Sequence, residues 1–302
     1  MKQILILFAC TGFLLVGILS GCGNQKAITL VNTLTFSLGD LQSLRLDYDA
    51  DDIHVLESDN NKVILKEYMN EDKKSYYART STQNGELLIT EGDRPVHSGF
   101  ESYIEIYIPQ DYTNSLSLHS TSGKIKSETA LNLSGDFCVD TTRGIIDVSN
   151  TKVSNIKITS TNGNLSFENI AAASIEIRTT NATTSFDQAN GVISYQSKGG
   201  KLTASGINGS GSFNASGEGS IDISFTGVSG DISAYSKNGS LALALPSQLA
   251  FKFSATTKEG SIDTSFANQL AVTDNTSAGT VGISPEISIE LETRSGDIKV
   301  SR

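Results

Sequence analysis

Short runs of alternating apolar and polar residues cover most of this chain, whereas apolar residues at helical spacing are rare. Val, Ile and Leu alternate with Ser, Thr, Asp and Lys, which is the two-residue period of a half-buried β-strand. Within residues 34–115 turn residues separate these runs, and Asn84-Gly85 between two of them is a good hairpin signal. The pattern predicts an all-β protein that begins with an irregular N-terminal β region over residues 34–115.

A repeat of about 20 residues, centred on a turn glycine, occupies residues 116–302. Successive turn positions lie 18 to 21 residues apart as far as Gly260. These positions are Gly123, Gly144, Gly163, Ala182 in place of a glycine, Gly200, Gly219, Gly239, Gly260 and finally Gly296. Apolar residues recur seven and five residues before each turn position and two and four residues after it. Each unit is therefore predicted to contain two short strands with one buried face.

One such unit cannot bury its apolar face alone, and stacking turns the apolar positions into continuous internal rows. We therefore predict a β-solenoid, similar to a single-stranded β-helix, over residues 116–302. In this arrangement Ile156, Ile175 and Ile193 should line one interior row. An antiparallel β-sandwich is the alternative arrangement of the same strands.

Several features depart from the regular repeat. The unit at Gly219 is out of step by one residue and offers Phe213 and Ala215 as its inward pair. Residues 268–284 are polar and are expected to form either a degenerate coil or an inserted loop. The last strand, residues 297–302, is predicted to be an exposed end of the stack, with the N-terminal region over the other end. A third apolar position suggests a short third side, at Leu133, Val153, Ala172, Ile207 and Val228.

The N-terminus has the form of a lipoprotein signal. Residues 1–21 contain a basic start, an apolar core and small residues, and Leu19-Ser-Gly-Cys22 reads as a lipobox. We expect cleavage between Gly21 and Cys22, lipid on Cys22, and a tether over residues 22–33. Two or more lipid chains anchor a protein stably. The predicted location is therefore outside the cytoplasm, on the outer face of the cell membrane or on an outer membrane.

Charge and cysteine content narrow the functions further. Removal of the signal peptide takes away Lys2, so 22 basic residues (23 − 1) face 33 acidic residues, a difference of −11. This balance argues against a nucleic-acid partner. Cys10 leaves with the signal, so Cys138 has no cysteine to pair with inside the chain. It is predicted to be an inert outward thiol, with an intermolecular disulfide as the alternative.

The sequence contains no recognisable catalytic, cofactor-binding or metal-ligating motif, and we predict no such site. His54, His97 and His119 are far apart in the sequence and lack metal spacing. Asp222 and Asp263 share an outward column with Asp147, and the repeat predicts that they lie two coils apart, roughly 10 Å. An inverting glycosidase could use such a pair, but no aromatic or basic cluster accompanies it. Core or cross-strand packing is expected for the tyrosines of the N-terminal region, Tyr68, Tyr76, Tyr77, Tyr103 and Tyr107.

Three stretches resemble a known family. They are Tyr103-Ile-Glu-Ile-Tyr-Ile-Pro109, the repeated Ser-Gly-Lys/Asp-Ile units, and the closing segment Ile287 to Val300. Over roughly residues 40–302 the chain is similar to the bacterial family labelled "putative adhesin", which are β-strand-repeat proteins with a domain of unknown function. The resemblance implies a lipoprotein or membrane-attached protein without a catalytic motif, and some members lie near envelope stress-response systems.

Taken together, these features predict a lipid-anchored cell-envelope protein that is not an enzyme. Its expected role is adhesin-like binding or structural support, and the family resemblance adds a link to envelope stress. We expect it to be attached to the membrane through Cys22 and to bind an envelope protein or a glycan. No cofactor is expected. The alternative is a polysaccharide-active enzyme on a β-helix scaffold. The sequence leaves the oligomeric state open.

Overall fold

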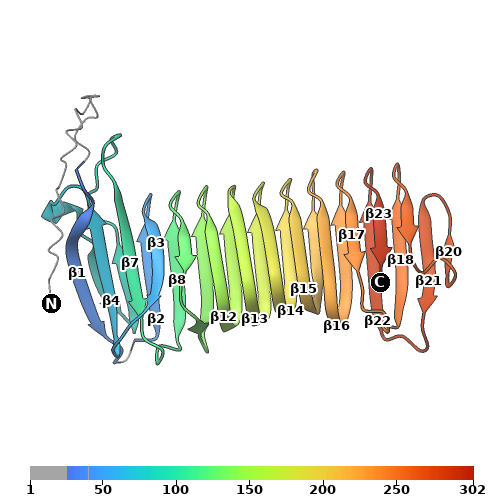
Figure 1. The fold of residues 1–302 in the computed structure, drawn as a ribbon, viewed down its shortest axis with the longest axis horizontal. Coiled ribbons are helices and arrows are strands. Elements are labelled where there is room, and N and C mark those ends of the chain that lie inside the picture. The colour runs from blue at the N-terminus through green and yellow to red at the C-terminus, as the bar shows by residue number, and fades with distance from the viewer. Residues whose placement is uncertain (1–25, 40) are drawn as a thin grey trace, which may run out of the picture.

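The computed structural model describes residues 26–39 and 41–302, which form one elongated stack of β-strands (Figure 1). The all-β prediction is confirmed, since a single 3-10 turn, Lys74–Tyr76, is the one helical element in this part of the chain. No helix within it is long and apolar enough to span a membrane. The predicted signal peptide, the Gly21–Cys22 cleavage site and lipidated Cys22 lie outside the described residues.

The strands of the N-terminal half are short. They are β1 (Thr29–Ser37), β2 (Ser43–Tyr48), β3 (Asp52–Glu57), β4 (Lys62–Met69), β5 (Arg79–Gln83), β6 (Glu86–Thr90), β7 (Ser102–Ile108), β8 (Ser115–Ser120), β9 (Ile125–Ser127), β10 (Leu131–Asn132) and β11 (Asp136–Thr141). Five long strands follow: β12 (Ile146–Ser160), β13 (Asn164–Thr179), β14 (Thr183–Ser197), β15 (Leu202–Ala215) and β16 (Ile221–Ser236). The chain ends with β17 (Leu241–Ala244), β18 (Phe251–Thr257), β19 (Ile262–Thr264), β20 (Leu270–Val272), β21 (Thr276–Val281), β22 (Ile287–Thr293) and β23 (Ile298–Ser301).

Two long faces enclose the core. The first face runs in the order β5, β6, β2, β8, β11, the second halves of β12 to β16, then β22, β18, β21 and β20. The second face runs in the order β1, β4, β7, β3, β9, the first halves of β12 to β16, then β17, β23 and β19. Pairing is parallel from β6 to β18 and from β7 to β19. The solenoid is thus confirmed, and the antiparallel sandwich is wrong.

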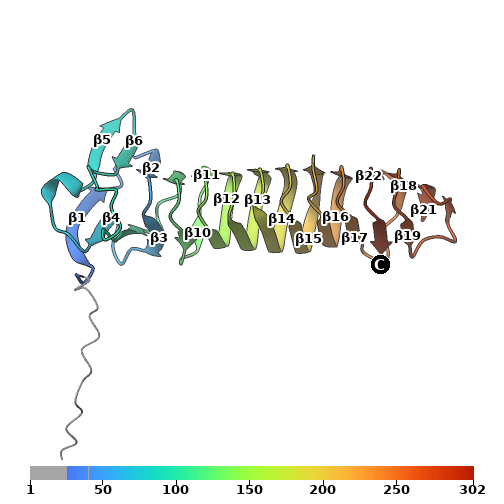
Figure 2. The same ribbon diagram turned by 90° about the horizontal axis from the view of Figure 1, so that it is seen from above.

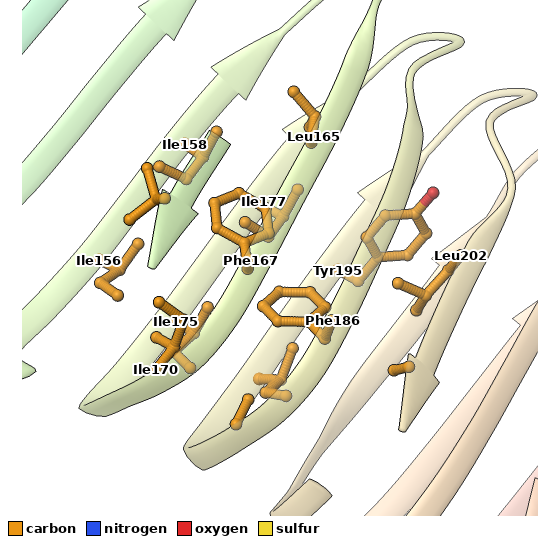
Figure 3. Close-up of a cluster of buried hydrophobic side chains, with 14 of the residues drawn as sticks. Ile156, Ile158, Leu165, Phe167, Ile170, Ile175, Ile177, Phe186, Tyr195 and Leu202 are labelled. Atoms are coloured by element: carbon orange, nitrogen blue, oxygen red, sulfur yellow. The ribbon is translucent and has the colours of Figure 1, made fainter. Parts of the chain in front are cut away.

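The predicted interior row is present. Ile156 pairs with Ile175, which pairs with Ile193, and all three side chains are buried. Figure 3 shows Ile156 and Ile175 on neighbouring coils of this row.

In the unit at Gly219, Phe213 and Ala215 are buried, as predicted, but they do not occupy the predicted columns. Gly211 pairs with Ile193, Phe213 pairs with Tyr195, and Ala215 pairs with Ser197. The turn before Gly219 is one residue longer than the turn before Gly200, so counting back from the glycine misplaces the strand, and each of the two residues lies two positions later in the coil than predicted, on the same face.

A short third side closes each central coil. Leu133, Val153 and Ile207 are buried there, and Ala172 and Val228 are partly buried. The corner before it requires a left-handed backbone at Asn150, Asn169 and Gln188, with φ of 49°, 52° and 61°. Asparagine tolerates this conformation well. Asn169 Nδ2 also donates a hydrogen bond to Asn150 Oδ1 at 2.8 Å, which links two coils along the corner.

The C-terminal coils do not stack in chain order. β22 lies between β16 and β18, and β23 lies between β17 and β19. The last strand is therefore internal, and its prediction as the exposed end is wrong. The chain first skips one position, forms the β18–β19 coil, and returns to fill the gap. Residues 268–284 contain the β20–β21 hairpin, which adds antiparallel strands outside β18.

At the N-terminal end, β2 and β3 form a coil that stacks directly on β8 and β9. Ile53 pairs with Ile125, so the interior rows continue through residue 115 into the N-terminal part. The antiparallel strands β1, β4 and β5 then close this end of the stack. Figure 2 shows these strands gathered beyond the regular coils, which run on as a straight rod.

Candidate functional site

The column of turn glycines lies along one rim of the stack, and close backbone approach explains it. A Cβ added at Gly144 would lie 2.2 Å from the carbonyl oxygen of Gly123, and a Cβ at Gly239 would lie equally close to that of Gly219. Ser236 Oγ accepts a hydrogen bond from Gly239 N at 2.9 Å and donates one to Gly219 O at 2.7 Å. The rim therefore satisfies its own polar groups. Its signature, Ser/Thr three residues before the glycine, is readable in the sequence and was missed.

A cleft of about 820 Å³ opens at the N-terminal end, between the β6–β7 connection and the turn from β2 to β3. Its rim carries acidic side chains from both segments together with two histidines. These residues are Asp49, Asp52, Glu91, Glu101, Glu105, His54 and His97. These residues are distributed over four connections and strands, so the repeat pattern in the sequence does not bring them together.

Beneath this cleft Arg94 forms ion pairs with Asp51 and with Glu67, whose Oε1 lies 2.5 Å from Arg94 Nη2. The Arg94, Asp51 and Glu67 side chains are 4%, 1% and 0% exposed. Arg94 also lies over the ring of Tyr48, 5.2 Å from its centroid. Burial raises the pKa of Glu67 and lowers that of Arg94 to about 10. The cluster fixes the β6–β7 connection against β2 and β4, so its first role is structural.

The outer surface of β4 and β7 carries the densest group of aromatic side chains. Tyr68 and Tyr103 pair across the two strands and stack with ring centroids 4.5 Å apart. Glu105 Oε2 accepts hydrogen bonds from Tyr68 Oη at 2.9 Å and from Tyr107 Oη at 2.7 Å. Lys66 Nζ lies 4.2 Å from the centroid of the Tyr107 ring. We call these five residues the tyrosine face.

The environment of the tyrosine face keeps its phenols protonated. Desolvation first, and then the bond to Glu105, raise the pKa of Tyr107 to about 12, and the same causes raise that of Tyr68. Cross-strand packing is confirmed for Tyr68 and Tyr103, and Tyr76 is buried as a core residue. The sequence pattern could not show that three tyrosine rings stay partly exposed on the same outer surface of β4 and β7.

His54 and His97 line the same cleft, and each of the three histidines contacts a carboxylate of its own. His54 Nδ1 lies 2.8 Å from Glu128 Oε1, His97 Nε2 lies 3.7 Å from Glu71 Oε1, and His119 Nδ1 lies 3.5 Å from Asp140 Oδ2. Each therefore contacts a different carboxylate on the surface. Within residues 26–39 and 41–302, no group of three or more His, Cys, Asp or Glu side chains is arranged to hold a metal ion.

The outward aspartates are farther apart than predicted. Asp222 pairs with Ala242, which pairs with Lys299, which pairs with Asp263. Because the last coil is inserted here, three strand spacings separate the two carboxylates, roughly 14 Å. Glycosidase pairs extend to ~9.5 Å at most. Asp222 and Asp263 are therefore too far apart to act as the two carboxylates of an inverting glycosidase.

Cys138 lies on the outer side of β11 between two buried residues, as predicted, although it is only partly exposed. Desolvation, reinforced by Asp136, raises the pKa of its thiol. The thiolate is the reactive form of cysteine. A raised pKa therefore agrees with an inert thiol.

Curated protein sequences yield no significant match to this chain. Solved structures do, and three of them, all from bacteria, are described as putative adhesins. The one from Bacteroides fragilis is 16% identical, with a TM-score of 0.47, over 92% of this chain and 100% of its own. The one from Parabacteroides merdae is 10% identical, with a TM-score of 0.46, over 90% and 96%. The one from Parabacteroides distasonis is 11% identical, with a TM-score of 0.42, over 89% and 96%.

The family comparison covers most of the chain. The model of the family described as Toastrack DUF4097 matches residues 41–301. The description of this family names no enzymatic activity. The match includes the β2–β3 coil, every coil of the repeat and the inserted last coil, and the chain therefore belongs to the Toastrack DUF4097 family.

Proposed function

We propose that this protein is a lipid-anchored, non-catalytic component of the bacterial cell envelope that binds a partner in the manner of an adhesin. The tyrosine face carries the proposal. Its rings present apolar area with polar tips, a combination enriched at protein interfaces. Rigid strands hold them, so little conformational entropy is lost when a partner binds.

The stacked coils give the molecule a stiff body. Each coil is covered on both sides by its neighbours, and the core continues from β6 and β7 to β18 and β19. The tyrosine face on β4 and β7 lies at the same end of this body as the proposed anchor, so a bound partner would lie close to the anchored end. We expect the partner to be a glycan or an envelope protein. A role in the response to envelope stress would be a more specific version of this binding function.

Binding is tested by capture from detergent-solubilised envelopes and from a panel of envelope glycans. The double variant Tyr68→Ala/Tyr103→Ala should weaken capture about tenfold or more, as truncation of an interface anchor does. Tyr235→Ala is the matched control, because Tyr235 also lies on an outer strand surface, far along the stack on β16. Equal capture by both variants would contradict the proposed binding face.

Anchoring is tested separately. In a bacterial host the chain should enter the membrane fraction and take up labelled fatty acid, and Cys22→Ser should abolish both. Unacylated mature protein in the medium would contradict the anchor while leaving the binding proposal open to its own test.

A further inference from the structure

The edge strands at the two ends of the stack differ in length and in charge. At the C-terminal end the outermost strands β19 and β20 have three residues each. At the N-terminal end the outermost strands are β5, which has five residues and includes Arg79, and β1, which has nine. Short length and charge are two ways in which proteins keep an edge from pairing with another chain.

β1 has neither protection. Its sequence, Thr-Leu-Val-Asn-Thr-Leu-Thr-Phe-Ser, contains no charged residue and no proline. Among the strands that the structure describes it pairs with β4 alone, so the backbone groups on its other edge are unpaired. A bulge between Leu30 and Asn32 disturbs its start, and the register is regular from Asn32 to Ser37. Figure 1 shows β1 beside β4 at the N-terminal end of the stack.

Apolar side chains accompany this open edge. Ile28 is 37% exposed and Leu30 is 49% exposed. Behind β1, a groove of about 430 Å³ separates it from β5 and β6 and includes Phe36, Leu38 and Leu41 in its lining. These three side chains pack on the core but are not fully covered. A long, uncharged and partly apolar edge is a predicted site of strand addition.

We propose that the strand added there is β1 of a second copy, so that two solenoids join at their N-terminal ends. A two-fold axis pairs a strand antiparallel with itself, which is the symmetry of most homodimers. Because β1 is uncharged, self-pairing brings no like charges together. The added strand would extend the second face and cover the groove.

The lipid anchor, which rests on the proposed function, also favours a second copy of this chain as the partner of the β1 edge. Thr29 follows Cys22 by seven residues (29 − 22), so a lipid on Cys22 would hold β1 of every copy close to one membrane surface. Two copies related by an axis perpendicular to that surface would then meet edge to edge. The pairing itself requires no lipid and can be measured without one.

The first test is the mass in solution of the chain from Gly23 onward, which retains every described element. Sedimentation equilibrium should give twice the monomer mass. Thr33→Glu/Thr35→Glu should give monomers, because pairing would bring two new carboxylates from each copy into one joined edge. Thr33 lies opposite Lys66 on β4, so a glutamate there does not weaken the fold. Thr80→Glu/Thr82→Glu on β5 is the matched control and should remain dimeric.

The second test locates the axis. In a Cys138→Ser background, single cysteines placed from Val31 to Phe36 should form intermolecular disulfides at one position or two adjacent positions, because only the residue at the axis faces its own copy. A monomeric starting chain, a dimer that survives Thr33→Glu/Thr35→Glu, or a scan without cross-links would overturn the proposal. Failure to capture a glycan or protein partner would leave it intact.

Discussion

At the residue scale, the stack depends on positions where two coils approach more closely than a side chain allows. The glycines of the rim are required by this contact and mostly not by an unusual backbone, since Gly144 and Gly239 do not have positive φ. Ala182 occupies the same column and keeps the hydrogen bond from its N–H to Thr179 Oγ1 at 3.0 Å. The column of turn glycines can therefore accept a Cβ, as at Ala182, where the backbone of the two coils is adjusted to it.

Replacing Gly144 with alanine should destabilise the protein. The new Cβ would lie 2.2 Å from the Gly123 carbonyl oxygen, so two coils must move apart. We expect a loss of about 1–3 kcal/mol in the free energy of unfolding, measured by urea denaturation. Gly99→Ala is the control, because its nearest atom is 3.8 Å away and no clash arises. Equal stability of the two variants would show that close approach does not select glycine on the rim.

The pair formed by His54 and Glu128 should give a small pH dependence. The hydrogen bond from His54 lowers the pKa of the Glu128 carboxyl below its ordinary value of 4.5. A lowered folded-state pKa means that the stabilising contribution is complete above that ordinary value. It is then lost as the pH falls through the lowered pKa.

The measurement is urea denaturation of the unmodified chain and Glu128→Gln across the acidic range. The advantage of the unmodified chain should stay constant at neutral pH and shrink below about pH 4.5. Glu290→Gln is a suitable control, because Glu290 makes no ion pair within the part of the chain that the structure describes. A constant advantage down to the acid limit would contradict the assignment.

At the element scale, the out-of-order insertion of the last coil ties the C-terminal part together. β22 holds β18 to β16, and β23 holds β19 to β17. Asp297 Oδ1 strengthens one junction by accepting hydrogen bonds from Ser261 N at 2.8 Å and Ser261 Oγ at 2.9 Å. The β18–β19 coil and the β20–β21 hairpin therefore depend on a segment that the chain supplies last.

Truncation after Ser284 tests this dependence. If coils stacked in chain order, the cut would trim one end and leave the rest folded. In the observed order it removes the strands between β16 and β18, so residues 245–284 should become sensitive to protease while the preceding coils stay resistant. Mass spectrometry of the limit fragments gives the answer. Persistent protection of β18 in the truncated chain would contradict the observed strand order.

At the scale of the whole molecule, one core runs the length of the stack. Leu44 and Leu46 of β2 pair with Leu116 and Leu118 of β8, so the irregular N-terminal strands share their buried rows with the repeat. Neighbouring coils that share such interfaces unfold together when the interface energy is large. The N-terminal strands should therefore not melt as a separate unit.

Two spectroscopic signals can test this cooperativity. The chain has no tryptophan, and seven of its nine tyrosines lie before residue 116, so tyrosine fluorescence reports mainly on the N-terminal strands. Far-ultraviolet circular dichroism reports on all strands. Both should give the same urea midpoint, and Ile193→Ala should lower both midpoints together. Separate midpoints would show that the coupling across residue 115 is weak.

The sequence by itself determined the local structure: the strand period, the twenty-residue coil and the inward residues, as Ile156, Ile175 and Ile193 show. These follow from alternation and turn chemistry, which act over a few residues. Tertiary structure alone decided which coils are neighbours. Every coil offers similar apolar rows, so the pattern cannot distinguish chain-order stacking from the insertion of β22 and β23. It also decided the Arg94 cluster, whose partners lie 27 and 43 residues away, and the open edge at β1. Ion pairs and strand edges depend on residues that are distant in the sequence, and the repeat period carries no information about which of them are neighbours.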